Sequence, residues 1–465
     1  MNASAVARLC SQLARAAREA ALTVLAMAAT AAAAAWLAPG PAAPVLGAVL
    51  ALSLARSHLL AARHGWLEAL ATLPVVSLGT LGIGMLLHHW PWLGAAVFVA
   101  VISATSWVRR HGPLAQRLAR LATLPLVTVL VVPPLPHAAR AGDSPLVALI
   151  VPMAVALLAL ASVFAVQRLG RLLRWLPTPV AAAVAAPPAS AASMRPSPPV
   201  RMALQMAVAL GVAFCVGLLA FPTHWRWLVL TAFLVNSGSL GRLDVARKSV
   251  LRVVGAAAGT LLATAVAGHA GADGATTGAL AIACVFAGLV LRVLGYGWWV
   301  LGITLALALL QALEPAAAPW LLWQRVAEIV LGAAVGVAAA VLVFPIPSTD
   351  ILRGRIGRAL AAMSEALDPA VALRKPVDVA GPLALVTEMR PVFRVHRFAR
   401  RRRPLRPDEW IASLAACEAP VLALAASGQA PGEVRRAIGA ARKAMREPVE
   451  IGPALAALRD VLGRS

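Results

Sequence analysis

Residues 251–265 read LRVVGAAAGTLLATA, with Arg252 at the head of a run whose only other polar side chains are threonines. Gly255 and Gly259 lie four residues apart, and Thr260 follows at once. On a helix, residues at that spacing share one face, and small residues there let a second membrane helix approach closely. This stretch therefore predicts a closely packed membrane helix with a positive charge near one end.

The composition of the whole chain extends this prediction to most of its length. Of the 465 residues, 60% are hydrophobic and 13% are charged, and the mean hydropathy is +0.81. A soluble protein of this size cannot bury so much apolar surface, because much of its exterior must face water. We therefore predict an all-α, polytopic membrane protein.

Twelve apolar runs are the candidate membrane spans. They fall near 20–37, 43–55, 66–87, 92–108, 121–135 and 146–166, and then near 202–221, 225–236, 250–268, 276–291, 297–313 and 326–344. A segment rich in Pro, Ala and Ser, which is typical of a linker, separates the two sets. We predict four parts: a six-helix membrane half at 1–167, the linker at 168–200, a second six-helix half at 201–345, and a cytoplasmic helical domain at 346–465.

The formal charge of +23 is distributed so that it predicts an orientation. With the N-terminus inside, only Arg140, Arg226 and Arg325 fall on the outer side among the arginines of the membrane segments. Arg-rich short loops stay in the cytoplasm, so we expect both termini to be cytoplasmic and no nucleic-acid partner. Since each half has an even number of spans, the two halves would form a parallel repeat.

After residue 346 the pattern becomes that of amphipathic helices, which recur near 382–400, 407–426, 432–446 and 452–463. The chain shows no enzyme signature. It has no Gly-Lys pair for a Walker A loop, no H-E-x-x-H and no G-x-S-x-G, and its four cysteines are scattered. We therefore predict no enzymatic activity, no cofactor and no metal site.

Ionisable side chains near the apolar runs are the candidate transport residues. Glu328 follows Arg325 by three residues, so the two share a helix face. Either Glu328 exchanges protons while Arg325 binds an anion, or the pair only neutralises itself near the outer surface. Arg252 and Arg292 lie at the cytoplasmic ends of spans nine and ten, where they could bind substrate or extend to the headgroups.

Small and polar residues give two further expectations. Gly332 and Gly336 form a second small-residue seam, and packing of this seam against Gly255 and Gly259 would hold Arg252 at a helix junction. Asn236 is polar inside a span, where it would either line a water-filled path or bond a neighbouring helix.

Three aromatic residues near the membrane surface complete the candidate set. Tyr296, Trp298 and Trp299 offer faces to a substrate, or they are ordinary interfacial aromatics. The second span of each half, 43–55 and 225–236, is short. Short spans at equivalent positions indicate either a transport site or a local adjustment of the bilayer.

Three segments together resemble the fusaric acid resistance, or aromatic acid exporter, family of bacterial inner-membrane transporters. They are LRVVGAAAGTLLATAVAG (251–268), YGWWVLGITLALALLQ (296–311) and RVAEIVLGAAVGVAAAVLVFP (325–345). The matching features are an Arg-x-x-Gly-x-x-x-Gly-Thr start, an aromatic-led span, and a last span from Arg325 through Gly332 to Phe344 and Pro345. The resemblance covers roughly 201–360.

The resemblance implies a multi-pass transporter of the inner membrane that exports aromatic carboxylates or similar small organic anions. Some members work with a periplasmic adaptor protein, and the family has a distant likeness to plant anion channels. The larger exporters carry a big cytoplasmic region where this chain has a short linker. Partners expected on this basis are membrane lipid, the organic anion, an adaptor and further copies of the chain.

Other classes of function stay open from the sequence. SLGRLDVARKS (239–249) is faintly similar to a loop of major-facilitator carriers, although its glycine and arginine positions do not match. A passive anion channel would use the same arginines without coupling to a gradient. A membrane-anchored envelope protein would instead work through its cytoplasmic helices.

Overall fold

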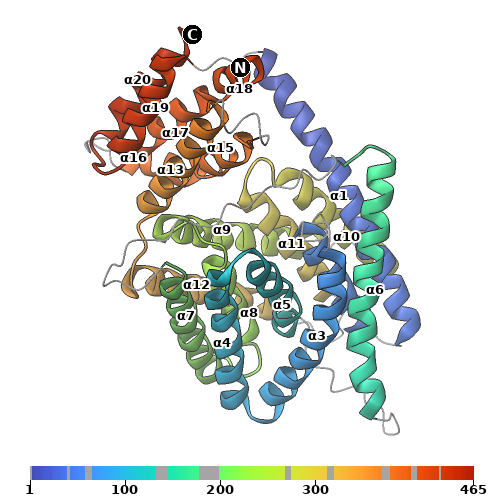
Figure 1. Ribbon diagram of the computed structural model, residues 1–465. Helices are drawn as coiled ribbons and strands as arrows, with labels where there is room; N and C mark the ends of the chain where they lie inside the picture. The colour runs from blue at the N-terminus through green and yellow to red at the C-terminus, as the bar shows by residue number, and fades with distance from the viewer. Residues whose placement is uncertain are drawn as a thin grey trace. The chain divides into compact units, whose positions relative to one another are not determined.

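The computed structural model describes residues 3–38, 42–57, 65–131, 145–176, 198–267, 274–311, 319–368, 377–399, 406–428 and 431–464, and every regular element in these ranges is helical (Figure 1). The chain forms two compact units. The first holds the helices of the apolar segments up to Phe344, and the second holds 238–247 together with the chain from Pro345 onward. The fold class is therefore that of an all-helical protein.

A helix overlaps each of the twelve apolar runs. The first set comprises α1 (Ala3–Leu37), α2 (Ala42–Arg56), α3 (Gly65–His89), α4 (Pro91–Val108), α5 (Pro113–Val131) and α6 (Pro145–Leu172). The second comprises α7 (Pro198–Ala220), α8 (Arg226–Asn236), α9 (Arg242–Ala267), α10 (Gly274–Leu291), α11 (Tyr296–Gln311) and α12 (Pro319–Leu342). Helices α6 and α7 overlap both ends of the predicted linker, and residues 177–197 of it lie outside the described residues.

Length and hydropathy identify a polytopic membrane protein. Among the described residues, nine helical segments are long and apolar enough to cross a membrane, and eight of these belong to α1, α3–α7, α9 and α12. Helices α2, α8, α10 and α11 are apolar but shorter. The 11 residues of α8 rise only about 16 Å, against roughly 30 Å of hydrocarbon. Twelve crossings therefore remain a prediction.

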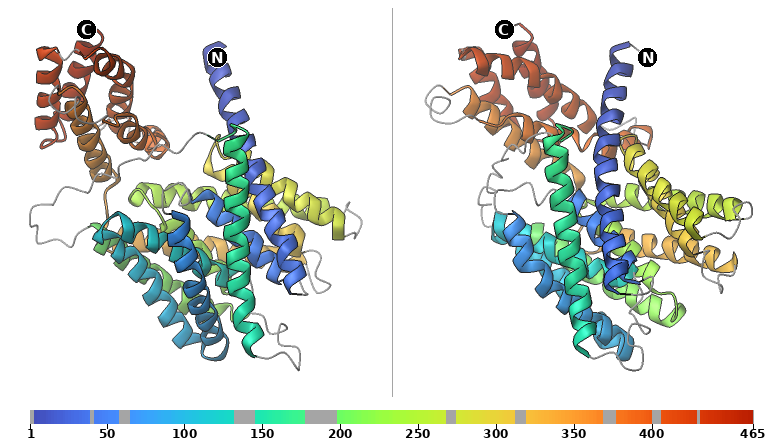
Figure 2. Two further views of the ribbon diagram at one scale, coloured as in Figure 1. Left: turned by 45° about the vertical axis from the view of Figure 1, so that its right-hand side comes forward. Right: turned by 90° about the vertical axis from the view of Figure 1, so that its right-hand side faces the viewer.

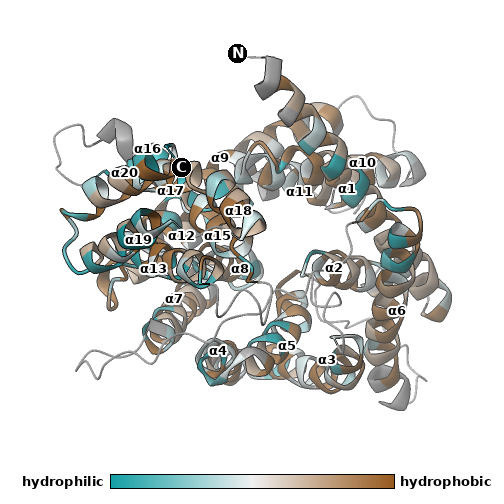
Figure 3. Ribbon diagram, turned by 45° about the horizontal axis from the view of Figure 1, so that its top comes forward, coloured by the Kyte–Doolittle hydropathy of each residue, from teal (hydrophilic) through white to brown (hydrophobic). Residues whose placement is uncertain are grey.

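The ninth apolar segment, Pro407–Ser427, lies in the second unit. It consists of two helices, and their apolar side chains Trp410, Leu414 and Val421 are buried in the core of that unit. Its hydropathy is thus explained by a core formed within the chain. Figure 3 shows mainly apolar residues along α3, α6 and α7, in contrast to the hydrophilic residues along α16 and α19 of the second unit.

Helix packing in the first unit follows the same pattern in both sets. The long helices α1 and α6 run side by side (Figure 2), and each also packs on α2. Helices α7, α8 and α12 pack pairwise in the corresponding way. Between the sets, α4 packs on α7 and α10 packs on α1, which are equivalent contacts when the sets are exchanged. This pattern supports the predicted repeat, which stays a prediction.

The second unit contains α13 (Ser348–Ala366), α15 (Ala380–Thr387), α16 (Arg390–Ala399), α17 (Pro407–Ala416), α18 (Glu418–Ser427), α19 (Gly432–Ala444) and α20 (Ile451–Leu462). Its core includes Leu352, Leu383, Leu414, Ile438 and Leu458, one from each of five helices. The unit is therefore held together by apolar side chains drawn from most of its helices.

Two of the amphipathic helices expected in this region are divided in the structure. The stretch 382–400 separates into α15 and α16, and 407–426 separates into α17 and α18. Pro391 and Pro420 lie in the first turns of α16 and α18. A proline has no backbone N–H to continue the preceding helix and is tolerated in a first turn, so it favours a new helix there.

The start of α9 packs with the second unit, although the sequence places 238–247 in the second membrane half. Leu240 and Leu243 pack against the core of this unit. The backbone N–H of Arg242 donates to the carbonyl of Ile346 at 3.1 Å, and that of Leu243 donates to Ser348 Oγ at 3.3 Å. These bonds tie the first turn of α9 to the start of α13.

Candidate functional site

Arg252 lies well inside α9 rather than at its end. The helix begins at Arg242, so about 15 Å of helix precedes Arg252. Its side chain is only 4% exposed, and among the described residues its Nε has no hydrogen-bond partner. Arg252 is not at the end of its helix, because α9 starts eight residues earlier than its apolar run. Its predicted place at the cytoplasmic end of the membrane span stays a prediction. A buried guanidinium group needs a counter-charge or water to offset its lost hydration.

Arg325 of α12 is equally buried, at 4% exposure. Its Cζ lies 3.6 Å from the ring centroid of Trp227 on α8, in a cation–π contact. The charges of Arg325 and Arg252 are close enough to repel each other. The sequence places these two arginines at opposite membrane faces, yet the packing of α8, α9 and α12 brings them into one buried cluster.

Glu328 is the acidic member of this cluster. It lies one turn beyond Arg325 on α12, its side chain is fully buried, and its charge is attracted to that of Arg325. Gln324, one turn earlier on α12, is the polar side chain next to this carboxylate. Two arginines and one carboxylate leave a formal charge of +1, so the cluster has an excess positive charge away from water.

Tyr296 belongs to the cluster, whereas Arg292 and Trp298 do not. Tyr296 begins α11, packs against Ala256, and interacts electrostatically with Arg252. Arg292 is exposed in the turn after α10, and Trp298 is 47% exposed. Among the predicted aromatic and cationic residues, Arg252 and Arg325 are thus buried, Tyr296 is half-buried, and Arg292 and Trp298 are exposed.

Asn236 joins two helices. Its side-chain amide donates to the carbonyl of Ala232 at 2.9 Å and to that of Gly336 on α12 at 3.4 Å. Of the two roles open from the sequence, the structure shows a bond to a neighbouring helix. This bond joins the last residue of α8 to α12.

The two glycine seams pack against different helices, so they do not hold Arg252 by packing on each other. A Cβ at Gly255 would lie 2.9 Å from the carbonyl oxygen of Gly297 on α11, and one at Gly259 would lie 3.0 Å from that of Leu301. Gly332 instead approaches the carbonyl of Leu228 on α8. The neighbouring Thr260 is buried, with no hydrogen-bond partner for Oγ1 among the described residues.

Gly336 also faces α8, where a Cβ would lie 2.9 Å from Nδ2 of Asn236. Close approach of backbones is what small residues permit. The α9–α11 and α12–α8 contacts therefore place Arg252 beside Tyr296, and Arg325 over Trp227.

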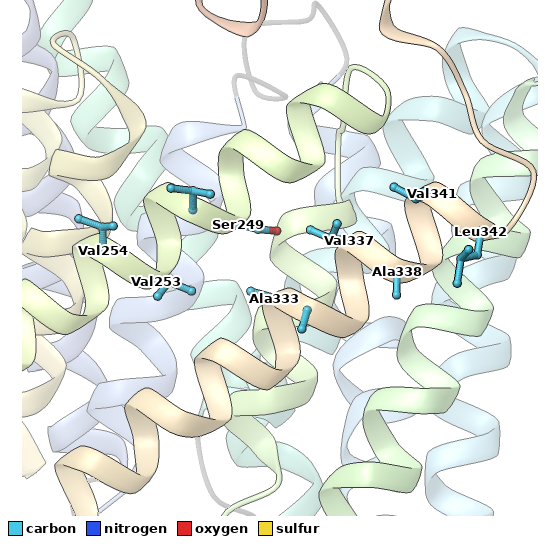
Figure 4. A pocket seen from close by; sticks show the side chains of 10 residues that line it. Ser249, Val253, Val254, Ala333, Val337, Ala338, Val341 and Leu342 are labelled. Carbon is cyan, nitrogen blue, oxygen red and sulfur yellow. The ribbon is translucent and has the colours of Figure 1, made fainter. Parts of the chain in front are cut away.

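A groove of about 650 Å³ lies between α9 and α12 (Figure 4). Its lining is aliphatic except for Ser249 and includes Val250, Val253, Ala333 and Val337. Since no cationic side chain lines it, this groove is unsuited to a carboxylate. Val250 is mostly exposed, as expected of a surface that contacts lipid.

Sequence reasoning missed two members of the site. Trp227 reads as one of several interfacial aromatics, and Arg56 reads as a loop charge. In the structure, Cζ of Arg56, the last residue of α2, lies 4.4 Å from the ring centroid of Trp299 on α11. Each of these Arg–Trp pairs joins residues far apart in the chain, so no local pattern could reveal it.

A comparison with protein families matches residues 208–339 to the model described as fusaric acid resistance protein-like. No curated protein and no solved structure matches the chain. The matched segment contains Trp227, Arg252, Tyr296, Arg325 and Glu328, whereas Arg56 lies outside it. This chain is a membrane protein whose residues 208–339 are similar to the fusaric acid resistance protein-like family.

Proposed function

We propose that the chain is a transporter that exports small organic anions, such as aromatic carboxylates, across the bacterial inner membrane with both termini in the cytoplasm. The observation that carries this proposal is the buried cluster of Arg252, Arg325 and Glu328, in which two cations face one acid. A membrane helix bundle rarely retains such groups unless they act on an ion or a substrate.

A carboxylate ligand would satisfy the excess charge. Guanidinium groups bind carboxylates through paired, charge-assisted hydrogen bonds. The Nε–H of Arg252 is a donor for such a bond, and it has no partner among the described residues. Trp227 and Tyr296 provide aromatic faces at the same place, which suits a ligand with a ring. The charge favours an anion, and the aromatic residues favour an aromatic one.

Glu328 is the proposed proton-coupling residue. When ionised, its carboxylate is attracted to Arg325, so it competes with the carboxylate of the substrate for the positive charge of that arginine. Protonation removes that competition, so proton binding and anion binding at this site should favour each other. Gain and loss of a proton by Glu328 would then change the affinity of the site for the anion during the transport cycle.

Transport by the purified full-length protein in proteoliposomes tests the proposal. Uptake of radiolabelled benzoate, with aliphatic acids as competitors, should be saturable in the wild type. Arg252→Gln and Arg325→Gln should each weaken it by roughly tenfold or more, the effect of losing one hydrogen bond to a charged group. Arg120→Gln on α5, where the side chain is exposed, is the matched control and should transport normally.

Two outcomes would contradict the proposal. Normal uptake by both buried-site variants would show that the cluster does not bind the substrate. Uptake that never saturates and ignores any ion gradient would instead identify a passive anion channel. Gel filtration and thermal unfolding of each variant would confirm that it folds.

A further inference from the structure

Arg56 brings a cation from the first set of helices to the second. It is the last residue of α2, and its Cζ lies 4.4 Å from the ring centroid of Trp299 on α11. Leu52, one turn earlier on α2, packs in a cluster with Ala306 of α11. The contact between Arg56 and Trp299 therefore lies where side chains of α2 and α11 meet, a place called here the α2–α11 junction.

The α2–α11 junction is electrically positive. The positive charges of Arg56 and Arg292 repel each other. The phenol of Tyr296 lies within electrostatic range of both Arg56 and Arg252. Tyr296 thus stands between the junction and the buried cluster.

No acid neutralises Arg56 among the described residues of the first unit. The carboxylates described there are Glu19, Glu68 and Glu328. Glu19 pairs with Arg15 at 3.0 Å, Glu68 pairs with Arg117 at 2.9 Å, and Glu328 lies beside Arg325. Nε of Arg56 is buried, and its N–H donates to no acceptor among the described residues.

We propose that the α2–α11 junction is a second anion subsite, in which Arg56 and Trp299 hold an organic carboxylate before it reaches Arg252 and Arg325. This inference rests on the proposed function. It adds a subsite that exists only where both sets of helices meet, because α2 supplies the cation and α11 supplies the aromatic face.

A simpler role for Arg56 is to interact with the C-terminal dipole of α2, which favours a cation there. That role explains the charge but not its position over an indole ring. An arginine stacked on an aromatic face keeps its N–H groups at the edge of the guanidinium plane, where they can bind a carboxylate. The Arg325–Trp227 pair has the same arrangement at 3.6 Å, so the geometry occurs twice along the proposed path.

The test compares Arg56→Gln and Arg56→Lys with a matched control in the full-length protein. Arg110 stacks on Trp107 at 3.9 Å in the same half of the chain, so Arg110→Gln removes the same kind of contact elsewhere. Benzoate uptake into proteoliposomes gives KM and kcat for each protein. We expect Arg56→Gln to raise KM roughly tenfold or more with a smaller change in kcat, Arg56→Lys to raise it less, and Arg110→Gln to leave both unchanged.

The outcomes separate this inference from the proposed function. If Arg56→Gln transports like the wild type while Arg252→Gln fails, the second subsite is refuted and the proposed function stands. An equal effect of Arg110→Gln would also refute the subsite, because it would show a general need for Arg–Trp contacts. If the wild type transports no carboxylate, or if neither Arg56→Gln nor Arg252→Gln changes transport, both proposals fail.

Discussion

The guanidinium group of Arg325 stacks on the indole ring of Trp227, with 3.6 Å between Cζ and the ring centroid. Trp227 is in the first turn of α8, and Arg325 is in the second turn of α12. The pair forms because Gly332 and Gly336 let α12 lie against the backbone of α8. A buried cation is thus held in a defined position by an aromatic face, with the carboxylate of Glu328 one turn further along the same helix.

Trp227→Leu should weaken substrate binding while leaving the charge in place. A cation–π contact contributes about 0.5–2 kcal/mol, so we expect the benzoate KM to rise roughly twofold to thirtyfold. Trp323→Leu is the control, because Trp323 lies exposed on the same helix, α12. Equal KM values for Trp227→Leu and the wild type would show that the ring does not position Arg325.

Glu328→Gln should bind anions more tightly and independently of pH. In the wild type, falling pH protonates Glu328 and removes the negative charge that competes for Arg325, so affinity should increase as the pH falls. The variant should bind benzoate with high affinity at every pH, with a gain on the order of tenfold over the ionised wild type. Its coupled transport should be slower. Equilibrium binding of benzoate between pH 5 and 8 measures both effects.

His224 is the control for this titration, because its Nδ1 lies 3.5 Å from Nε2 of Gln324, the neighbour of Arg325. His224→Asn should keep the pH dependence if Glu328 is its source. A pH dependence that survives in Glu328→Gln and disappears in His224→Asn would assign the titration to the histidine.

Gly332→Ala should destabilise the helix bundle. The added methyl group would overlap the carbonyl oxygen of Leu228, so α8 and α12 would have to separate. Overpacking of this kind costs about 1–3 kcal/mol, which should lower the apparent Tm in detergent. At Gly211 on α7 a new Cβ meets nothing within 4 Å, so Gly211→Ala should be neutral or stabilising. Identical melting of the two variants would contradict the α8–α12 contact.

Cys417 should resist thiol reagents until the second unit unfolds. Its side chain is fully buried, its S–H donates to the carbonyl of Ser413 at 3.2 Å, and burial raises the pKa of the thiol to about 11. Near pH 8 only about one molecule in a thousand would carry the reactive thiolate. The neutral thiol contributes to the free energy of unfolding of the second unit. This contribution should be present at pH 8 and should be lost as the pH rises toward and through about 11.

Maleimide labelling of single-cysteine variants checks this expectation. The exposed thiol of Cys10 should react readily at pH 8, whereas Cys417 should react only after denaturant is added. Comparable rates for the two thiols in the native protein would mean that the core around Cys417 is open.

The helices of both units could be predicted from the sequence, because helix formation and hydropathy depend on neighbours within a few turns. Each of the twelve apolar runs overlaps one helix. Their ends were less predictable. The first turn of α9 is polar, so it has no place in an apolar run, yet Leu240 and Leu243 gain a core to pack against in the second unit.

How the residues of the site come together was decided by tertiary structure. Arg252 was identified by its charge within a glycine-rich run, a local signal. That it shares a buried cluster with Arg325, and that Arg56 extends to Trp299, follows from which helices pack together. Those contacts depend on side chains distant in sequence, whose fit exists only once the helices have assembled.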